Sequence, residues 1–136
     1  MSKLLLDTNA YSKLVNLSDR SVKEAIEETE TVFISTIILG ELLSGFKRGS
    51  LEKKNRELLN RFLDKPTVEI VSLNKETAEI YADVLLNLIR KGTPIPTNDI
   101  WIAASAIEHG AVLVTYDTHF LKIPGLRLWD RLKIKN

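Results

Sequence analysis

Short apolar runs alternate along the chain with longer segments in which apolar residues recur every three or four positions. Runs that are apolar at nearly every position are typical of strands buried on both faces of a sheet, and they lie at Lys3–Leu6, Val32–Ile34, Val68–Val71 and Val112–Val114. The longer segments have the period of amphipathic helices. This alternation predicts an α/β fold in which a parallel central sheet of four to five strands is flanked by helices on both faces.

Helix-capping residues and glycines divide the segments between the strands. Helices are expected from Asp7-Thr8-Asn9 through Val15, from Ser18 or Asp19 to about Thr29, from Ser35 or Thr36 to Gly49, from Ser50 to Leu63, from Lys75 to Lys91, and from Asn98 or Asp99 to Gly110. The last of these is apolar on nearly every face, so we expect it at the centre of the fold, and Trp101 and Trp129 in the core. Leu126–Trp129 is the expected fifth strand.

Composition limits the class of protein. With 136 residues, 44% hydrophobic and 27% charged, the chain suits one globular domain, residues 1–136. The absence of cysteine excludes a disulfide scaffold, a thiol nucleophile and a thiolate zinc site. Leu4–Leu6 is too short for the core of a signal peptide, and no stretch approaches the ~18 apolar residues of a membrane span. We therefore expect a cytoplasmic protein without a membrane segment.

The net charge of +1 conceals an uneven distribution. Basic residues gather between Lys47 and Arg61 and again from Lys122 to the end of the chain, whereas the segment from Asp19 to Glu30 is acidic. Basic patches of this kind bind phosphates, but solvated helix faces have the same composition. The pattern alone leaves both interpretations open.

Acidic residues stand where a parallel α/β sheet binds ligands, which is at the carboxyl ends of the strands. Asp7 directly follows the first strand, and Asp117 comes just after the fourth. Glu41 lies in the helix after the second strand, and Asp99 lies at the start of the buried helix. The sequence therefore predicts that four carboxylates from distant segments meet in one cleft.

Purely structural roles are available for three of these residues. Asp7 is a good helix cap, Asp99 suits the positive end of a helix dipole, and Asp117 suits a turn. Glu41 lacks such an explanation, because its helical neighbours three and four positions away are apolar or small. Its carboxylate requires a partner from elsewhere in the fold.

A cluster of four carboxylates indicates a bound cation or shared protons, because like charges repel. Oxygen ligands without histidine or cysteine favour Mg²⁺ or Mn²⁺ over Zn²⁺. Such an ion polarises a phosphoryl oxygen and activates water for in-line hydrolysis of a phosphodiester. The pattern thus predicts metal-dependent phosphodiester chemistry without a serine or cysteine nucleophile.

Neighbouring polar residues are weaker candidates. Thr8, Asn9 and Thr115 suit the orientation of a carboxylate or a metal-bound water, although capping and bonding at strand ends explain them equally well. We interpret His119 as a surface residue in preference to a phosphate contact. His109 is interpreted as a favourable cation near the end of a helix.

Four blocks of sequence contain the acidic residues, namely Leu4–Asn9, Ser35-Thr36 with Gly40–Gly45, Pro96–Ala104 and Leu113–Phe120. In this order they resemble the PIN-domain ribonucleases. The segments Gly45–Gly49 and Ile123–Leu126 resemble the VapC toxins within that family. The resemblance covers nearly the whole chain and shows no departure at the acidic positions.

The resemblance implies a Mg²⁺- or Mn²⁺-dependent endoribonuclease in which Asp7, Glu41, Asp99 and Asp117 form the metal cluster. VapC-like toxins commonly form a homodimer. A small antitoxin protein silences them and, together with the toxin, binds operator DNA. The resemblance therefore implies RNA as substrate, an antitoxin as partner, and DNA contact only through that antitoxin.

Two alternatives to a ribonuclease toxin stay open. One is a PIN module that binds RNA or antitoxin without turnover, and metal-dependent cleavage compared with metal-free binding distinguishes it. The other is an acidic-cluster phosphotransfer protein, such as a receiver domain or phosphohydrolase, in which Asp7 is phosphorylated. That alternative requires a lysine at a strand end where this chain has Thr115.

Overall fold

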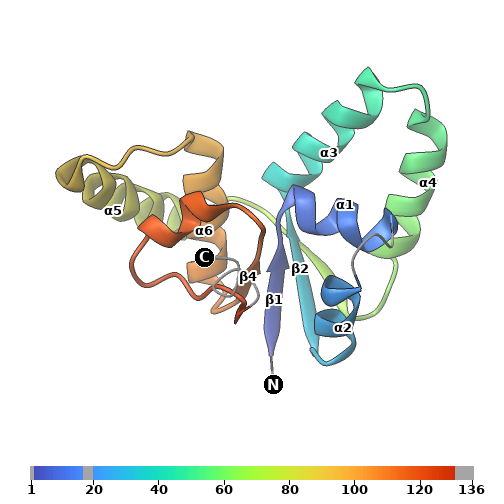
Figure 1. Cartoon of the computed structure of the whole chain (residues 1–136), viewed down its shortest axis with the longest axis horizontal. Helices are drawn as coiled ribbons and strands as arrows, with labels where there is room; N and C mark the ends of the chain where they lie inside the picture. The colour runs from blue at the N-terminus through green and yellow to red at the C-terminus, as the bar shows by residue number, and fades with distance from the viewer. Residues whose placement is uncertain (1, 17–19, 131–136) are drawn as a thin grey trace.

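The strands and helices of the computed structural model, which describes residues 2–16 and 20–130, follow the predicted alternation (Figure 1). The strands are β1 (Lys3–Leu6), β2 (Thr31–Ser35), β3 (Val68–Val71) and β4 (Val112–Val114). The helices are α1 (Thr8–Asn16), α2 (Ser21–Glu27), α3 (Thr36–Arg48), α4 (Glu52–Leu63), α5 (Lys75–Lys91), α6 (Thr97–Glu108) and the short 3-10 helix η1 (Thr118–Lys122).

The sheet has the strand order β3-β2-β1-β4, and every pairing in it is parallel. At the centre, Leu5 of β1 lies between Phe33 of β2 and Leu113 of β4. Because the strands are parallel, their carboxyl ends share one edge of the sheet. That edge receives the residues that follow β1 and β4, including Asp7 and Asp117.

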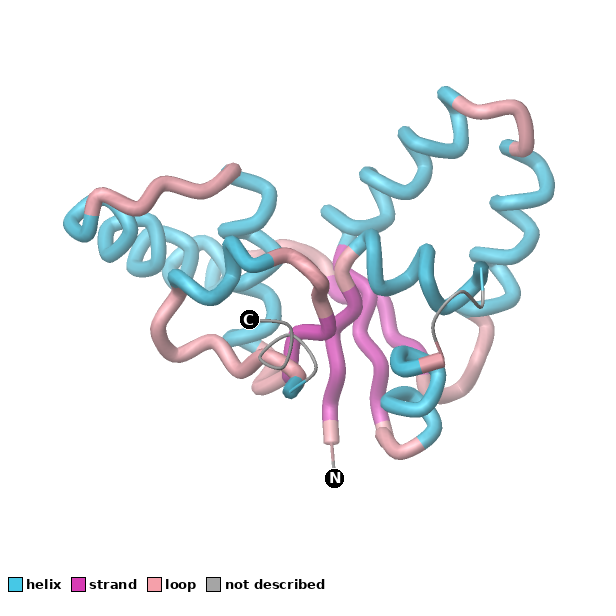
Figure 2. The backbone as a smooth tube through the Cα atoms, viewed as in Figure 1, coloured by secondary structure: helices cyan, strands magenta, loops and turns pink. Residues whose placement is uncertain are grey.

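Helices cover both sides of the sheet, as the alternation predicts. In Figures 1 and 2, α5 and α6 lie on one side of the strands, and α1, α3 and α4 lie on the other. The prediction that the apolar helix is central is confirmed, since Ile100, Ala103 and Ala106 of α6 are at most 1% exposed. This buried helix is therefore a rigid support for Asp99 in its first turn.

Local sequence explains the bounds of α5. The Asn74 side chain accepts the N–H of Thr77, and the Thr77 hydroxyl accepts the N–H of Asn74, so the pair forms a capping box. Gly92 ends the helix with φ of +67°, a left-handed conformation that glycine adopts without a steric penalty. The predicted end at Lys91 is thus confirmed.

The expected fifth strand at Leu126–Trp129 is wrong. Leu128 makes only an isolated parallel bridge with Leu113, supported by bonds from the Leu113 N–H to the Arg127 carbonyl and from the Trp129 N–H to the Leu113 carbonyl. Only the middle residue of β4 pairs with this segment, whereas all three residues of β4 pair with β1. The sheet of the described residues has four strands.

Two helix starts also differ from expectation. Helix α6 begins at Thr97, before Asn98, because Pro96 fits the position before a helix and its carbonyl accepts the Asp99 N–H. Helix α4 begins at Glu52 without a side-chain cap from Ser50, and the Glu52 carboxylate favours the positive end of the helix. The expected caps Ser18 and Asp19, and the basic residues Arg131, Lys133 and Lys135, lie outside the described residues.

The two tryptophans differ in burial. Trp129 is 6% exposed and its Nε1–H donates to the Thr115 carbonyl at 2.7 Å, so its expected core position is confirmed. Trp101 is only partly buried, and its ring stacks on Tyr81 of α5 with the ring centroids 3.9 Å apart. The core prediction for Trp101 is wrong because this side chain packs at the α5–α6 contact.

No described helix has the length and apolar content that crossing a membrane requires.

Candidate active site

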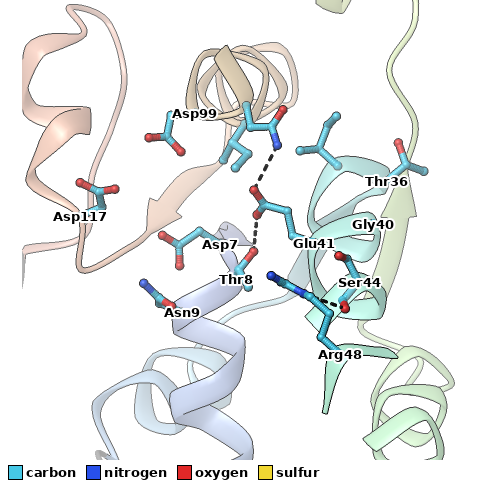
Figure 3. A pocket seen from close by; sticks show the side chains of 13 residues that line it. Asp7, Thr8, Asn9, Thr36, Gly40, Glu41, Ser44, Arg48, Asp99 and Asp117 are labelled. Atoms are coloured by element: carbon cyan, nitrogen blue, oxygen red, sulfur yellow. Dashed lines mark hydrogen bonds between the residues drawn. The ribbon is translucent and has the colours of Figure 1, made fainter. Parts of the chain in front are cut away.

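A cleft of about 700 Å³ lies at the carboxyl end of β1, and all four predicted carboxylates line it (Figure 3). Asp7 comes from the end of β1, Glu41 from α3, Asp99 from α6, and Asp117 from the segment between β4 and η1. Thr8 and Asn9 line the cleft beside Asp7. The structure therefore brings together the acidic residues that the sequence places in four separate segments.

Among the described residues, the Asp7 side chain has two hydrogen-bond partners, and Asp7 is only 6% exposed. Its Oδ1 accepts the N–H of Ala10 at 2.8 Å, which makes it the cap of α1. Its Oδ2 accepts the Thr115 hydroxyl at 2.5 Å. The capping role and the position in the cleft, which the sequence analysis treats as competing explanations, hold at the same time.

The electrostatic environment of Asp7 disfavours its charge. The pKa of its carboxyl is raised from 3.8 to about 6, chiefly by burial and in smaller part by the negative charges of Asp117 and Asp99. The bonds from Thr115 and Ala10 oppose that rise. A cation in the cleft would offset this cost, because it stabilises the ionised carboxylate.

Glu41 is held by residues of two other elements. Its Oε1 accepts the Thr8 hydroxyl at 2.5 Å, and its Oε2 accepts the Asn98 side-chain amide at 3.3 Å (Figure 3). The Ser35 hydroxyl accepts the Ile38 N–H and caps α3, which sets the helical position of Glu41. These are the distant partners that Glu41 requires. Asn98 has a site contact that the sequence analysis missed by treating it only as a helix start.

Asp99, Asp117 and His119 form a second part of the cluster. One ligand atom from each lies within 4.8 Å of the others, and His119 Nδ1 is 3.2 Å from Asp117 Oδ1 and 3.5 Å from Asp99 Oδ2. Burial raises the pKa of the Asp99 carboxyl, and the neighbouring charge of Asp117 adds to this rise. This group therefore adds a nitrogen to a set of ligands that the sequence analysis treats as oxygen only.

The His119 side chain is 45% exposed, but its Nδ1 atom is buried beside the carboxylates of Asp117 and Asp99. The interpretation of His119 as a surface residue is therefore wrong for this atom. Asp117 Oδ1 also accepts the backbone N–H of His119 at 2.9 Å, and this bond caps η1. The spacing of two residues is the available sequence signal, because an aspartate commonly binds the backbone two positions later. His109, by contrast, lies at the end of α6 as predicted, with Nδ1 2.9 Å from the Ser105 carbonyl oxygen.

Thr115 links two of the carboxylate-bearing segments. It is fully buried, and its hydroxyl donates to Asp7 while accepting the N–H of Asp117 at 2.9 Å. Thr115 thereby connects the Asp7 side chain to the segment after β4 that carries Asp117. Thr115 thus orients a carboxylate, one of the two roles that the sequence analysis leaves open for it.

The donor set fits a metal ion. Among the described residues, no lysine or arginine forms an ion pair with Asp7, Glu41, Asp99 or Asp117, and the His119 ring contacts only Asp99 and Asp117 of these four. Buried, mutually repelling carboxylates are the ligands that hard divalent cations bind. The acidic cluster therefore suits a metal ion.

Comparisons with known proteins identify relatives of this fold. The PIN domain family matches residues 4–126. Ribonuclease VapC2 of Rickettsia felis is 32% identical over 133 residues, covering 93% of this chain and 98% of the relative. The tRNA(fMet)-specific endonuclease VapC of Salmonella typhimurium is 30% identical over 132 residues, covering 96% and 98%.

Solved structures show the same arrangement of the chain. VapBC2 from Rickettsia felis, crystallised with a DNA fragment from its promoter, matches with a TM-score of 0.84 and 31% identity, over 93% of this chain and 97% of that one. DNA-bound VapBC from Salmonella typhimurium matches with a TM-score of 0.82 and 29% identity, over 95% and 98%. The similarity extends over nearly the full length of each protein.

Proposed function

Because this chain belongs to the PIN-domain family and is a ribonuclease of the VapC toxin type, we propose that it hydrolyses RNA at the cleft lined by Asp7, Glu41, Asp99 and Asp117. The observation that supports this site most strongly is the convergence of four carboxylates from separate segments. Within the described part of the chain, none of them is neutralised by lysine or arginine. We take residues 1–136 as one PIN domain.

The proposed cofactor is Mg²⁺ or Mn²⁺, held by the same four carboxylates. When bound, such an ion polarises the phosphodiester and lowers the pKa of an attacking water. The chain itself supplies the orientation of the ligands. Thr115 holds Asp7, while Thr8 and Asn98 hold the two oxygens of Glu41. Such supporting bonds fix ligand geometry before the ion binds.

The proposed partners are RNA, a second copy of the chain and an antitoxin protein, with operator DNA bound only through the antitoxin. The structures of VapBC2 from Rickettsia felis and VapBC from Salmonella typhimurium, both bound to DNA, support the antitoxin and DNA parts of this proposal. A cytoplasmic location follows from the same assignment, since cellular RNA and the antitoxin are found there. The tRNA(fMet) named for the Salmonella relative is the first RNA to examine.

Mapping RNA ends in producing cells tests the function. Cells that make the wild-type chain should gain new RNA ends at a small number of sites, and cells that make Glu41→Gln should lack them. Glu108→Gln is the matched control, because Glu108 is a partly buried glutamate whose carboxylate is outside the cleft. It should give the wild-type cuts.

Two results would contradict the proposal. Identical RNA ends with wild type and Glu41→Gln would show that the cuts come from another nuclease. Binding of RNA by the purified chain without any metal-dependent cleavage would favour the non-catalytic PIN module.

A further inference from the structure

Arg48 is the one lysine or arginine among the described residues that line the acidic cleft. It lies in the last turn of α3, seven residues after Glu41, so both side chains emerge from the same helix face. Its Nε–H donates to the Ser44 carbonyl at 3.2 Å, which holds the stem against the preceding turn (Figure 3). The side chain is thus directed back along α3 toward the carboxylates.

The terminal nitrogens of the Arg48 guanidinium have no carboxylate partner within 4.0 Å among the described residues, although Glu41 lines the same cleft. A guanidinium presents planar pairs of N–H groups that match two oxygens of a phosphate. With Nε already bonded, the outer N–H groups stay available to a ligand. The cleft therefore has an anion-binding group at one flank of its carboxylates.

The neighbouring Lys47 has a different environment. Its Nζ lies 3.5 Å from Glu52 Oε2, and the same oxygen accepts the Arg56 Nε–H at 2.9 Å. Lys47 does not line the cleft. The basic stretch from Lys47 to Arg61 is therefore not one uniform patch, because Lys47 and Arg56 share an acidic partner while Arg48 faces the site.

On the basis of the proposed function, we propose that Arg48 is an RNA-binding residue that holds a backbone phosphate next to the one that is cut. A cleft rich in carboxylates repels RNA, and a fixed guanidinium at its edge attracts the strand. The Arg48 Cα lies roughly 10 Å along the α3 axis from that of Glu41, at 1.5 Å per residue. The side chain folds back along α3 from this position, so we place its guanidinium beside the carboxylates and its contact on a phosphate that flanks the one cut, which gives the bound strand a defined register.

Kinetics of Arg48→Ala and Lys47→Ala test the inference on an RNA that the wild-type chain cuts. Both variants remove one positive charge from the last turn of α3. They therefore lower the net charge by the same amount, and each removes a cation that interacts favourably with the helix dipole. Arg48→Ala should raise KM about tenfold to a hundredfold, the range expected for a hydrogen bond to a charged group, and leave kcat within about threefold. Lys47→Ala should change neither by more than about twofold.

Binding without cleavage provides the second readout, measured in a Glu41→Gln background with a labelled single-stranded RNA of mixed sequence. Such a probe suffices because phosphate contacts carry no sequence information. Arg48→Ala should reduce the slope of log Kd against log salt by about 0.7, the value for one contact to a single strand. Arg48→Lys should keep the slope but lose part of the affinity, because it retains the charge without the planar pair of donors.

Three results would overturn the inference. These are kinetics of Arg48→Ala equal to those of Lys47→Ala, a loss of kcat at unchanged KM, and an unchanged salt slope. Equal melting temperatures of the two alanine variants establish that folding is not the cause of a difference. If the wild-type chain cuts no RNA, the proposed function fails separately, and the binding comparison still decides the role of Arg48.

Discussion

Two carboxylates in this molecule accept the same kind of hydrogen bond but have different surroundings. Thr115 donates to Asp7 at 2.5 Å, and Thr77 donates to Glu108 at 2.5 Å. Both threonines are fully buried. The first pair lies at the acidic cleft, whereas the second joins α5 to α6.

The difference lies in the neighbouring charges. Asp99 and Asp117 raise the pKa of Asp7, in addition to the effect of burial. Glu108 instead has His109 Nδ1 at 4.0 Å, and its donor Thr77 belongs to the capping box of α5. A threonine hydroxyl that donates to a carboxylate therefore also occurs at a purely structural contact between two helices. The concentration of like charge is what distinguishes the candidate site.

The largest expected difference is in catalysis. Asp7→Asn should lower the rate of metal-dependent RNA cleavage on the order of a hundredfold or more, because it removes a charged ligand from the cluster. Glu108→Gln should leave the rate within about twofold of wild type, since Glu108 only joins two helices. Initial rates on one RNA at saturating Mg²⁺ measure both. Equal losses in the two variants would remove the distinction between the pairs.

Stability without metal should change in the opposite direction. A rise of the Asp7 pKa from 3.8 to about 6 corresponds to a cost of about 3 kcal/mol for keeping this group ionised in the fold. Asp7→Asn should recover up to that amount at pH 7.5, because asparagine is also a good helix cap. Urea unfolding in the presence of chelator measures the gain. Lower stability of the variant would show that the carboxylate acts mainly as a cap.

The pH dependence of metal-free stability has a definite sign. Between about pH 4 and 6 the folded wild type holds a proton on Asp7 that the unfolded chain has released, so the free energy of unfolding falls as pH rises through this range. Below about pH 4, Asp7 is protonated in both states and its burial costs no stability. Above about pH 6, Asp7 is ionised in both states and the full free-energy cost of the buried charge applies. Asp7→Asn should lose this part of the slope, and Glu108→Gln should retain it. Unfolding curves at several pH values show whether the two slopes differ.

Metal binding should stabilise the fold by mass action. At a Mg²⁺ concentration of 100 times Kd, the expected gain is about 2.7 kcal/mol. Wild type and Glu108→Gln should gain equally, and Asp7→Asn should gain less. Melting temperatures across a Mg²⁺ titration test this, with NaCl of equal ionic strength as the control. A gain in Asp7→Asn equal to that of wild type would place the ion elsewhere.

The smallest expected effect is the change in stability at the Thr77–Glu108 pair. Glu108→Gln should lower the free energy of unfolding by about 1 kcal/mol, because a hydrogen bond to a charged acceptor becomes a bond to a neutral one. The sign is opposite to that of Asp7→Asn, and Mg²⁺ should not alter it. Urea unfolding with and without Mg²⁺ provides the measurement. A stabilising Glu108→Gln would mean that burial of charge also costs energy at this pair.

The fold and the positions of the carboxylates could be predicted because they depend on local pattern and one topological rule. Apolar strands indicate a parallel sheet, and a parallel sheet gathers its carboxyl ends at one edge. The pairing of Leu6 with Val114 then brings Asp7 close to Thr115. Neither the apolar pattern of the strands nor the shared edge depends on how side chains pack.

The details that could not be predicted depend on how elements pack together. The bond between Asn98 and Glu41 joins residues 57 positions apart on two different helices. The different environments of Lys47 and Arg48 depend on where α4 places Glu52. The segment Leu126–Trp129 has the composition of a strand, yet it pairs with β4 only at the Leu113–Leu128 bridge. Local sequence does not contain these distances.

Cleavage of RNA by the purified chain with and without chelator tests the central claim most directly, which is that the carboxylate cluster acts through a divalent cation. We expect cutting with Mg²⁺ or Mn²⁺, no cutting in excess chelator, and full recovery when Mg²⁺ is restored in excess. Undiminished cleavage by the pure protein in excess chelator would contradict the account.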